Sequence, residues 1–447
     1  MQLIQKTKQM SIKICIIYGL FFFGIITNAQ QVLTTEEAVE LALEHNYGIK
    51  IVNNIVDVAE NNADVLNSGF LPTLTGNAGA NYNLDNTEAE FSNGESATLT
   101  GAESNRYNAS VNLNYTLFDG LGRTYNYKRL KEEYQLSQLE ARETIETTIL
   151  QLCSIYYSVA QLSENRDALE EILIISKDRL TRAEYQFDYG QSTKLGVLNA
   201  EVDINNDSIN LINTRQQLKN AKRDLNVVTG NQLSEFFEVD IDLTFLMQLS
   251  KDELLAKTKA NNVALLQAEK NIAISQFDIK ASKSQYLPIV GLVGTYGWNK
   301  NNNNAAAFVA VSTNTGLSGG LNLTWNLFDG GSTITRVKNA KLNLENQKLQ
   351  KEQLLIDIER NFDNSWGDYQ NKLVIFQVQE DNIKTSLNNF ERTQEKFKIG
   401  QVTSIEFRQA QLNLRNSELS RNKAKYDAKL AELTVLQLSG ELLNIKF

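Results

Sequence analysis

The chain has very few of the residues that interrupt helices or build metal centres. Its 447 residues contain only two prolines and one histidine. Because proline removes a helix hydrogen bond and clashes with the preceding turn, a chain almost free of it permits long helices. One imidazole cannot supply the ligand set of a zinc site. The composition therefore favours long helices and predicts no bound metal.

Cysteine is almost as scarce. Cys15 lies near the start of the chain, and Cys153 is the only cysteine after it. A single thiol cannot close an internal disulfide. Cys153 sits beside Leu152 and Ile155 in a helical pattern. This predicts plain packing, since free cysteine behaves as a small buried hydrophobe.

Catalytic signatures are missing too. The sequence contains no Gly-rich phosphate loop ending in Lys and Ser or Thr, no Gly-x-Ser-x-Gly elbow and no Cys/His cluster. The lone His45 precedes Asn46 at an expected helix break, where we expect a structural role. We therefore predict that the protein is not an enzyme, binds no cofactor, and takes any energy that its function needs from a partner.

A long apolar run occurs only at the start of the chain. Three lysines precede an apolar run over 14–26, and small residues follow it up to Ala29. This pattern predicts a secretory signal peptide over 1–29. Because Cys15 lies at the beginning of the run, we expect no lipid anchor. No later segment reaches the ~18 uninterrupted apolar residues of a transmembrane helix.

Positive charge is in deficit. The formal net charge is −9, and loss of the signal peptide with its three lysines makes it −12. Contacts of Lys and Arg with phosphates dominate nucleic-acid binding, so an acidic chain is a poor candidate for it. We expect no nucleic-acid partner.

What the chain has in abundance is self-similarity. The tetrapeptide Leu-Phe-Asp-Gly occurs at 117–120 and again at 327–330, 210 residues later. The same offset carries 187–193 (FDYGQST) onto 397–403 (FKIGQVT), and a Leu-Pro pair precedes each tetrapeptide. This predicts two copies of one large unit. The predicted division is a first repeat over 30–232, a linker over 233–248 and a second repeat over 249–447.

Each repeat contains two segments in which polar and apolar residues alternate, as in a strand with one apolar face. The predicted strands are 73–85, 106–117, 289–299 and 316–328. Their length fits the ~9–11 residues of a tilted membrane strand, and Tyr and Trp mark their apolar faces. A half-buried sheet in a soluble domain shows the same alternation. The signal peptide favours the membrane, with 86–105 and 300–315 as extracellular loops.

Four strands cannot close a barrel, and open edges are not tolerated in lipid. Several chains must therefore share one barrel. Since the smallest closed barrels have about eight strands, a dimer with eight and a trimer with twelve both satisfy the pattern.

The rest of each repeat is predicted to be helical. Long helices are expected over 123–189 and 332–398, with apolar residues at heptad spacing that predict side-by-side packing. After each Gly-Gln corner a helix returns, over 193–229 and 403–439. Shorter helices near 35–67 and 251–284 lead to the Leu-Pro pairs, and Thr34 and Glu37 have the spacing of a capping box.

The corners connect strands with helices. We expect Asp119 and Asp329 to cap the long helices, and Gly120 and Gly330 to permit the sharp change of backbone direction. Pro72 and Pro288 mark the reverse change, because a residue before proline is biased away from helix.

The order of these features, present twice, resembles the TolC-type outer-membrane efflux protein family over essentially all of the mature chain. The resemblance implies a homotrimer whose twelve-stranded barrel lies in outer-membrane lipid and continues into a periplasmic tunnel of coiled-coil helices. It also implies that the helical tips bind a periplasmic adaptor protein, which connects the duct to an inner-membrane transporter.

The resemblance also assigns roles at the tips. Adaptor contact is expected at Gly190, Gln191, Thr193, Gly400, Gln401 and Thr403. Glu406 matches a position that is often acidic in the family, whereas Gln409 stands where a second acid would be. Three copies of Glu406, with Gln409, are therefore expected to form a pore constriction that favours cations. The alternative is an ordinary solvated glutamate. Asp188, Lys398 and Arg408 are candidates for ion pairs across the tip.

The sequence thus predicts a passive outer-membrane channel of a tripartite efflux or type I secretion system. Two alternatives remain open: a structural or adhesive coiled-coil stalk anchored by a shared β-barrel, and a soluble periplasmic scaffold.

Overall fold

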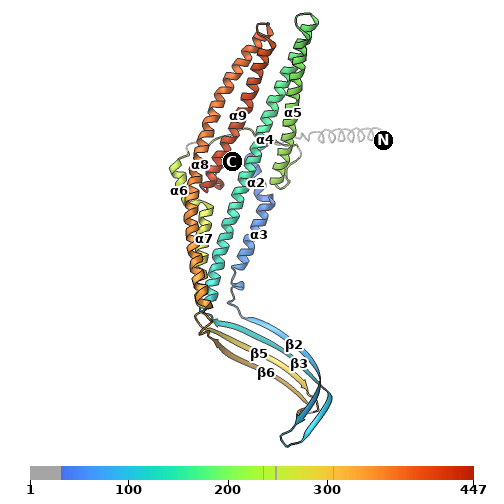
Figure 1. The fold of residues 1–447 in the computed structure, drawn as a ribbon, viewed down its shortest axis with the longest axis vertical. Helices are drawn as coiled ribbons and strands as arrows, with labels where there is room; N and C mark the ends of the chain where they lie inside the picture. Colours follow the sequence, from blue (N-terminus) through green and yellow to red (C-terminus); the bar gives the residue numbers. More distant parts are fainter. Residues whose placement is uncertain (1–31, 235, 247–248, 306, 447) are drawn as a thin grey trace, which may run out of the picture.

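The computed structural model describes residues 32–446 except 235, 247–248 and 306. The expected signal peptide lies outside the described residues. The chain is elongated, with a sheet at one end, the tips of two helical hairpins at the other, and short elements around the middle (Figure 1).

Four long helices form the two hairpins. In the first repeat, α4 (Gly122–Asp188) turns into α5 (Lys194–Val228), and in the second α8 (Ser332–Lys398) turns into α9 (Ser404–Leu438). At 1.5 Å per residue, the 67 residues of α4 or α8 extend about 100 Å. No proline lies in any of the four helices, so each hydrogen-bond ladder continues to the turn.

The shorter helical segments are both interrupted: the break next to Asn46 was expected, whereas the break in the second repeat was not. The segment 35–67 forms α2 (Thr35–His45), α3 (Tyr47–Asn62) and a 3₁₀ turn, η1 (Val65–Asn67), and 251–284 forms α6 (Lys251–Asn261) and α7 (Val263–Ser284). The predicted capping box at Thr34 forms at the start of α2.

The break between α2 and α3 and the break between α6 and α7 are each formed by an asparagine cap. The Oδ1 atom of Asn46 accepts from the Gly48 amide at 2.8 Å, and that of Asn262 accepts from the Ala264 amide at 3.1 Å. The Nδ2 atoms donate to Val228 and Leu438 respectively, at the ends of α5 and α9. In each repeat, one asparagine thus caps the start of one helix and binds the end of another.

The sheet has four antiparallel strands. They are β2 (Thr73–Glu90), β3 (Ser96–Phe118), β5 (Ile289–Asn302) and β6 (Val311–Thr324), in the order β2-β3-β5-β6. Pairing of Val111 with both Gly76 and Tyr296 fixes the register across three strands.

Four strand boundaries differ substantially from the prediction. β2 and β3 continue through most of 86–105, which was predicted as a loop. Residues 91–95 lie outside both strands, and a bulge at Asn86 and 100–101 shifts the register of the pairing. The hydropathy pattern ends where the apolar face ends, whereas backbone pairing continues through polar residues. The predicted strand 316–328 is β6, which begins earlier, at Val311, and ends earlier, at Thr324, so residues 325–328 lie outside the strand.

The largest apolar core lies around the middle of the chain. It includes Tyr156, Phe362 and Leu433, which are fully buried. A two-residue parallel ladder of β1 (Val32–Leu33) with β4 (Glu238–Val239) packs here, and a 3₁₀ turn, η2 (Leu442–Asn444), follows α9. Cys153 is buried in this core, as the sequence predicted.

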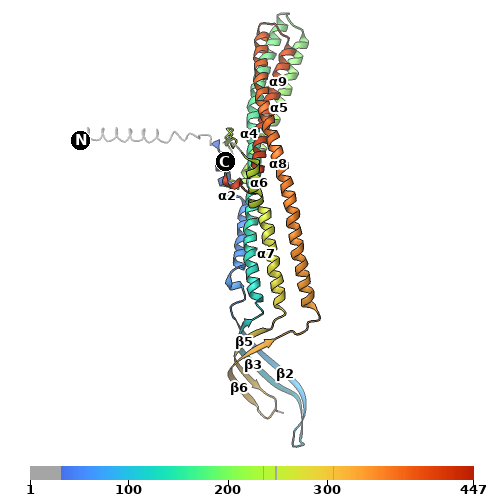
Figure 2. The same cartoon turned by 90° about the vertical axis from the view of Figure 1, so that its left-hand side faces the viewer.

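The helices form one curved layer with two free edges. Nearer the sheet the order is α3, α4, α7 and α8, and nearer the tips it is α5, α4, α9 and α8; Figure 2 shows the first order. One edge therefore carries β2, α3 and α5, and the other carries β6 and α8. Among the described helices, none is both long and apolar enough to cross a membrane.

Candidate functional site

The hairpin tips are built by glycines with left-handed backbone. Gly190 has φ +70° and Gly400 has φ +76°, a region that favours residues without a Cβ. The amides of Gln191 and Gln401 donate back to the carbonyls of Gln186 and Lys396, at 2.7 and 2.8 Å. These bonds satisfy helix-end carbonyls and set the direction of the returning helix.

The two tips differ at the start of the returning helix. Thr403 Oγ1 accepts from the Glu406 amide at 3.2 Å, and Glu406 Oε2 accepts from the Thr403 amide at 2.8 Å. These two bonds form a capping box. The equivalent position in the first repeat is Gly196, and Thr193 makes no side-chain cap there.

Glu406 is held as a carboxylate. The Thr403 backbone amide and then the Thr403 hydroxyl donate to it and lower its pKa. Gln409 lies three residues later on the same helix and donates to Asn413 Oδ1 at 2.9 Å. Both side chains are exposed, and their spacing places them on one face of α9.

Exposed apolar side chains beside each tip escaped the sequence analysis. The four are Tyr189 (79% exposed), Leu195 (64%), Ile399 (69%) and Ile405 (76%). Tyr189 corresponds to Ile399 at the 210-residue offset, and Leu195 to Ile405. The repeat alignment itself was therefore the signal that could have found them.

The expected ion pairs between Asp188, Lys398 and Arg408 were wrong. Lys398 pairs with Glu395 on its own helix at 2.7 Å. Arg408 points instead into the contact between α9 and the first hairpin, where it donates twice to Asp207, at 2.7 and 2.9 Å. Burial explains the difference, because a buried guanidinium needs a carboxylate partner.

A second link joins the tips. Arg182 of α4 donates to the Lys398 carbonyl at 2.7 Å and lies over the Phe397 ring at 4.9 Å. It therefore satisfies a carbonyl at the end of α8 and ties the two hairpins together.

The strand to helix corners contain the predicted aspartates, but not at the capping position. The residues at that position are Leu121 and Gly331, both left-handed and without side-chain caps. Asp119 accepts from the Arg123 amide at 2.8 Å, and Asp329 from the Thr333 amide at 2.8 Å. The left-handed turn brings each carboxylate back over the first helical amides.

The corner glycines share a backbone but not an environment. Gly120 and Gly330 both have φ +69°. A Cβ on Gly120 would lie 2.4 Å from the Ser284 carbonyl oxygen, whereas a Cβ on Gly330 would meet nothing within 4 Å. In the reverse corners, Pro72 and Pro288 immediately precede β2 and β5.

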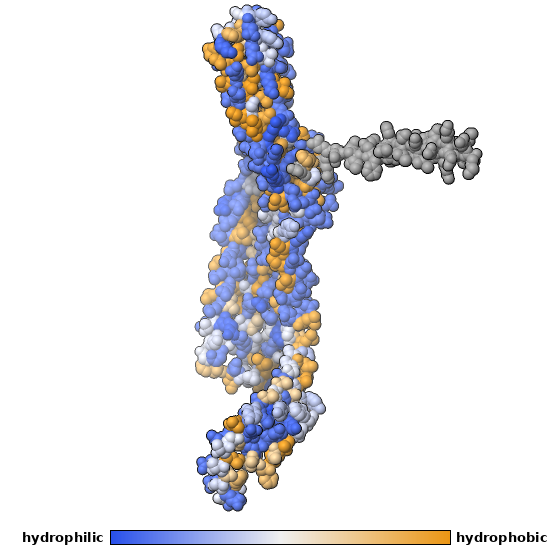
Figure 3. Space-filling view, turned by 90° about the vertical axis from the view of Figure 1, so that its right-hand side faces the viewer, coloured by the Kyte–Doolittle hydropathy of each residue, from blue (hydrophilic) through white to orange (hydrophobic). Residues whose placement is uncertain are grey.

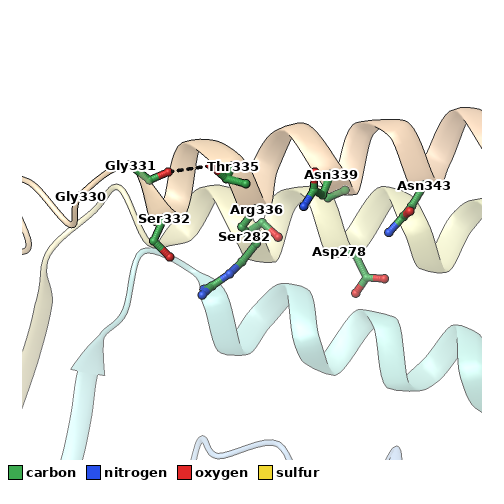
Figure 4. A pocket seen from close by; sticks show the side chains of 10 residues that line it. Asp278, Ser282, Gly330, Gly331, Ser332, Thr335, Arg336, Asn339 and Asn343 are labelled. Atoms are coloured by element: carbon green, nitrogen blue, oxygen red, sulfur yellow. Dashed lines mark hydrogen bonds between the residues drawn. The ribbon is translucent and has the colours of Figure 1, made fainter.

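A polar groove of about 670 Å³ lies beside the second corner (Figure 4). Its charged residues are already engaged, since Asp278 pairs with Arg129 at 3.6 Å and Arg336 donates to Gln285. The other lining residues are Gly, Ala, Ser, Thr and Asn. In the described part of the chain, no group of three or more His, Cys, Asp or Glu is arranged to hold a metal ion.

Comparison with known families matches both repeats. The family model described as outer membrane efflux protein matches residues 38–231 and 254–441. The chain belongs to this family. The family predicted from the repeated motifs, and with it the outer-membrane location and the role in efflux, are therefore confirmed.

Individual outer membrane efflux proteins are distant in sequence. The efflux protein BepC of Brucella suis is 20% identical over 421 residues, covering 94% of this chain and 88% of that relative. TolC of Salmonella enteritidis is 22% identical, covering 86% and 77%. The crystal structure of the Campylobacter jejuni CmeC outer membrane channel has a TM-score of 0.75 at 16% identity, covering 91% and 86%. The fold is therefore kept where most side chains differ.

Proposed function

We propose that three copies of this outer membrane efflux protein close into one duct that conducts substrates passively out of the cell. The two free edges of the layer carry the proposal. Among the described residues, β2 pairs only with β3, and β6 only with β5. In lipid, unpaired strand edges are costly, so β2 of one copy pairs with β6 of the next. Three copies then give twelve strands, which is the number that the family resemblance implies.

The helical edges support the same arrangement. The free edge helices each carry exposed apolar side chains: Ile51, Ile55 and Val58 on α3, Leu195, Leu198, Val202, Ile209 and Ile212 on α5, and Leu342, Leu349, Ile356, Val374 and Val378 on α8. Several of these are spaced by three, four or seven residues, as in a coiled-coil seam. Figure 3 looks onto the edge of α3 and α5, where apolar surface follows the hairpin.

Because the two free edges differ from each other, the contact between neighbouring copies is head-to-tail. An interface between two different surfaces forms a closed ring when the rotation between copies closes, and an open filament when it does not. A duct requires the ring, and burial of both seams would stabilise it.

Disulfide cross-linking tests the ring. The variant Ile212→Cys/Leu387→Cys carries one thiol on each edge helix, both exposed in the single chain. On mild oxidation in membranes, we expect covalent dimers and trimers on denaturing gels. Asn210→Cys/Leu387→Cys is the control, because residue 210 points away from the seam of α5. Equal cross-linking of both variants, or none with the first, would contradict this arrangement.

The tips are the proposed contact with the rest of the export system. We propose that Gly190, Gln191, Thr193, Gly400, Gln401 and Thr403, with the apolar side chains flanking them, bind a periplasmic adaptor that leads to an inner-membrane transporter. Exposed apolar pairs repeated beside both turns support this, because such patches on a soluble surface mark binding sites.

Glu406 and Gln409 are the proposed pore constriction. Glutamine can replace glutamate in a capping box, so Glu406→Gln removes the charge and keeps the helix start. In planar bilayers we expect small wild-type currents selective for cations, and Glu406→Gln to lose much of that selectivity. Thr403→Val breaks the cap but keeps the carboxylate, so selectivity should be retained.

Other results would point elsewhere. Currents with unchanged selectivity in Glu406→Gln would keep the duct and remove Glu406 from the constriction. Bilayers that contain inserted protein but stay silent at every voltage would favour the stalk.

A further inference from the structure

A layer of charged residues separates two parts of the contact between the first and second repeats. It lies between the stacked rings of Tyr157 and Tyr426, 5.8 Å apart, and the Asp207–Arg408 pair nearer the tips. The layer comprises Glu164 and Glu171 of α4, Glu380 of α8, and Glu418, Arg421 and Lys425 of α9. Four carboxylates thus face two cations.

Both cations are already committed. Glu164 lies 3.4 Å from Arg421 and 3.2 Å from Lys425. Arg421 also lies 3.7 Å from Glu380, and Lys425 donates to the Ile241 carbonyl at 2.8 Å. The remaining cation of this face, Arg415, pairs with Asp207 of α5 at 3.6 Å.

Glu418 is left without a counter-ion of its own. Among the described residues it forms no hydrogen bond and no ion pair within 4.0 Å. Its charged neighbours are Glu171, which faces it from α4, and Arg421, one turn along α9. Burial and then Glu171 raise the pKa of Glu418 to about 7, and Arg421 offsets only part of this.

We propose that Glu418 makes the contact between the two repeats sensitive to pH near neutrality. When Glu418 is protonated, it no longer repels Glu171, and α9 packs more tightly on α4. When it is ionised, an incompletely paired charge remains in the contact and weakens it. The effect on the contact is independent of transport; its consequence for the channel rests on the proposed function.

The direction of the pH effect follows from the raised pKa. The ordinary value is 4.5, so the fold favours the neutral carboxyl group. The stabilisation is fully present below pH 4.5 and is lost as the pH rises through about 7. A periplasm that follows the external pH would therefore tighten the contact in acid and loosen it in alkali.

Thermal unfolding of the purified full-length protein in detergent tests this step. Glu418→Gln mimics the protonated state, and Glu391→Gln makes the same change at an exposed position of α8. We expect Glu418→Gln to unfold at a higher temperature than wild type, by a margin that is small at pH 5.5 and grows to about 2 °C or more at pH 8.5. Glu391→Gln should follow wild type at both values. A Glu418→Gln difference that is the same at both pH values would overturn the proposal.

Conductance then tests whether the pH-sensitive contact between the repeats also affects the channel. If the contact between the repeats controls opening of the duct, the open probability of the wild-type channel rises between pH 5.5 and 8.5. The rise is smaller in Glu418→Gln. If no channel current is seen but the pH-dependent difference in unfolding remains, the duct is rejected and the pH-sensitive contact between the repeats is retained. A Glu418→Gln channel with the full wild-type pH response would reject its action on the channel.

Discussion

Gly120→Ala is expected to prevent the first strand to helix corner from forming, whereas Gly330→Ala is expected to be tolerated. Both residues have φ +69°, so each alanine carries the left-handed penalty of about 1–2 kcal/mol. Only at Gly120 would the new Cβ also lie 2.4 Å from the Ser284 carbonyl oxygen and 2.9 Å from Leu287 Cβ. Relief requires movement of α7 and the chain leading into β5, which adds roughly 1–3 kcal/mol or more.

The matched pair can be measured in membranes. The expected result is little or no folded Gly120→Ala, seen as a low amount in the membrane fraction and rapid proteolysis, with near-normal amounts of Gly330→Ala. Since the two variants make one chemical change in identical tetrapeptides, expression effects of the substitution are controlled. Similar accumulation of both variants would show that the first corner can adjust, and that the close approach to Ser284 is not limiting.

This contrast shows what the sequence could and could not establish. The repeats, the long helices and the positions of the corners follow from local patterns, because a heptad or an alternating face is written in neighbouring residues. The environment of Gly120 depends on Ser284, which is distant in sequence. The sequence indicated the helix break at Asn46, but not the equivalent break at Asn262, whose side chain also binds the end of α9.

In the candidate site, too, some features could be predicted from neighbouring residues, and others depend on residues distant in the sequence. Alignment of the repeats located both tips, and the resemblance singled out Glu406 and supplied a pore role that stays a prediction. The capping box of Glu406 was visible as Thr-x-x-Glu and was overlooked in favour of that role. Asp207 could not be found, because an aspartate in a polar stretch of helix normally faces solvent. Here Arg408 from the other repeat donates to Asp207 and compensates for the loss of water around its carboxylate.

Removal of Asp207 should be among the most destabilising single changes in the hairpins. The carboxylate is fully buried, accepts twice from Arg408, and accepts from Ser176 Oγ at 2.7 Å. Asp207→Asn removes the carboxylate that Arg408 contacts twice and Arg415 contacts at 3.6 Å. It leaves Arg408 only the partly exposed Asp203, at 3.4 Å. Loss of one partner from a buried ion pair costs about 3–5 kcal/mol. We expect a clearly lower unfolding temperature and protease cleavage near the tips.

The control and the reverse experiment make the cause identifiable. Asp224→Asn, an exposed position on the same helix, should have almost no effect. The double variant Asp207→Leu/Arg408→Met should recover part of the lost stability, because apolar residues of similar volume can often replace a buried ion pair, while Arg415 still loses its contact with Asp207. If Asp207→Asn behaves like Asp224→Asn, the pair does not hold the hairpins together. If the double variant is as unstable as Asp207→Asn, the loss comes from altered packing and not from the unpaired arginine, and the contact between repeats depends on the shape of this site more than on its charge.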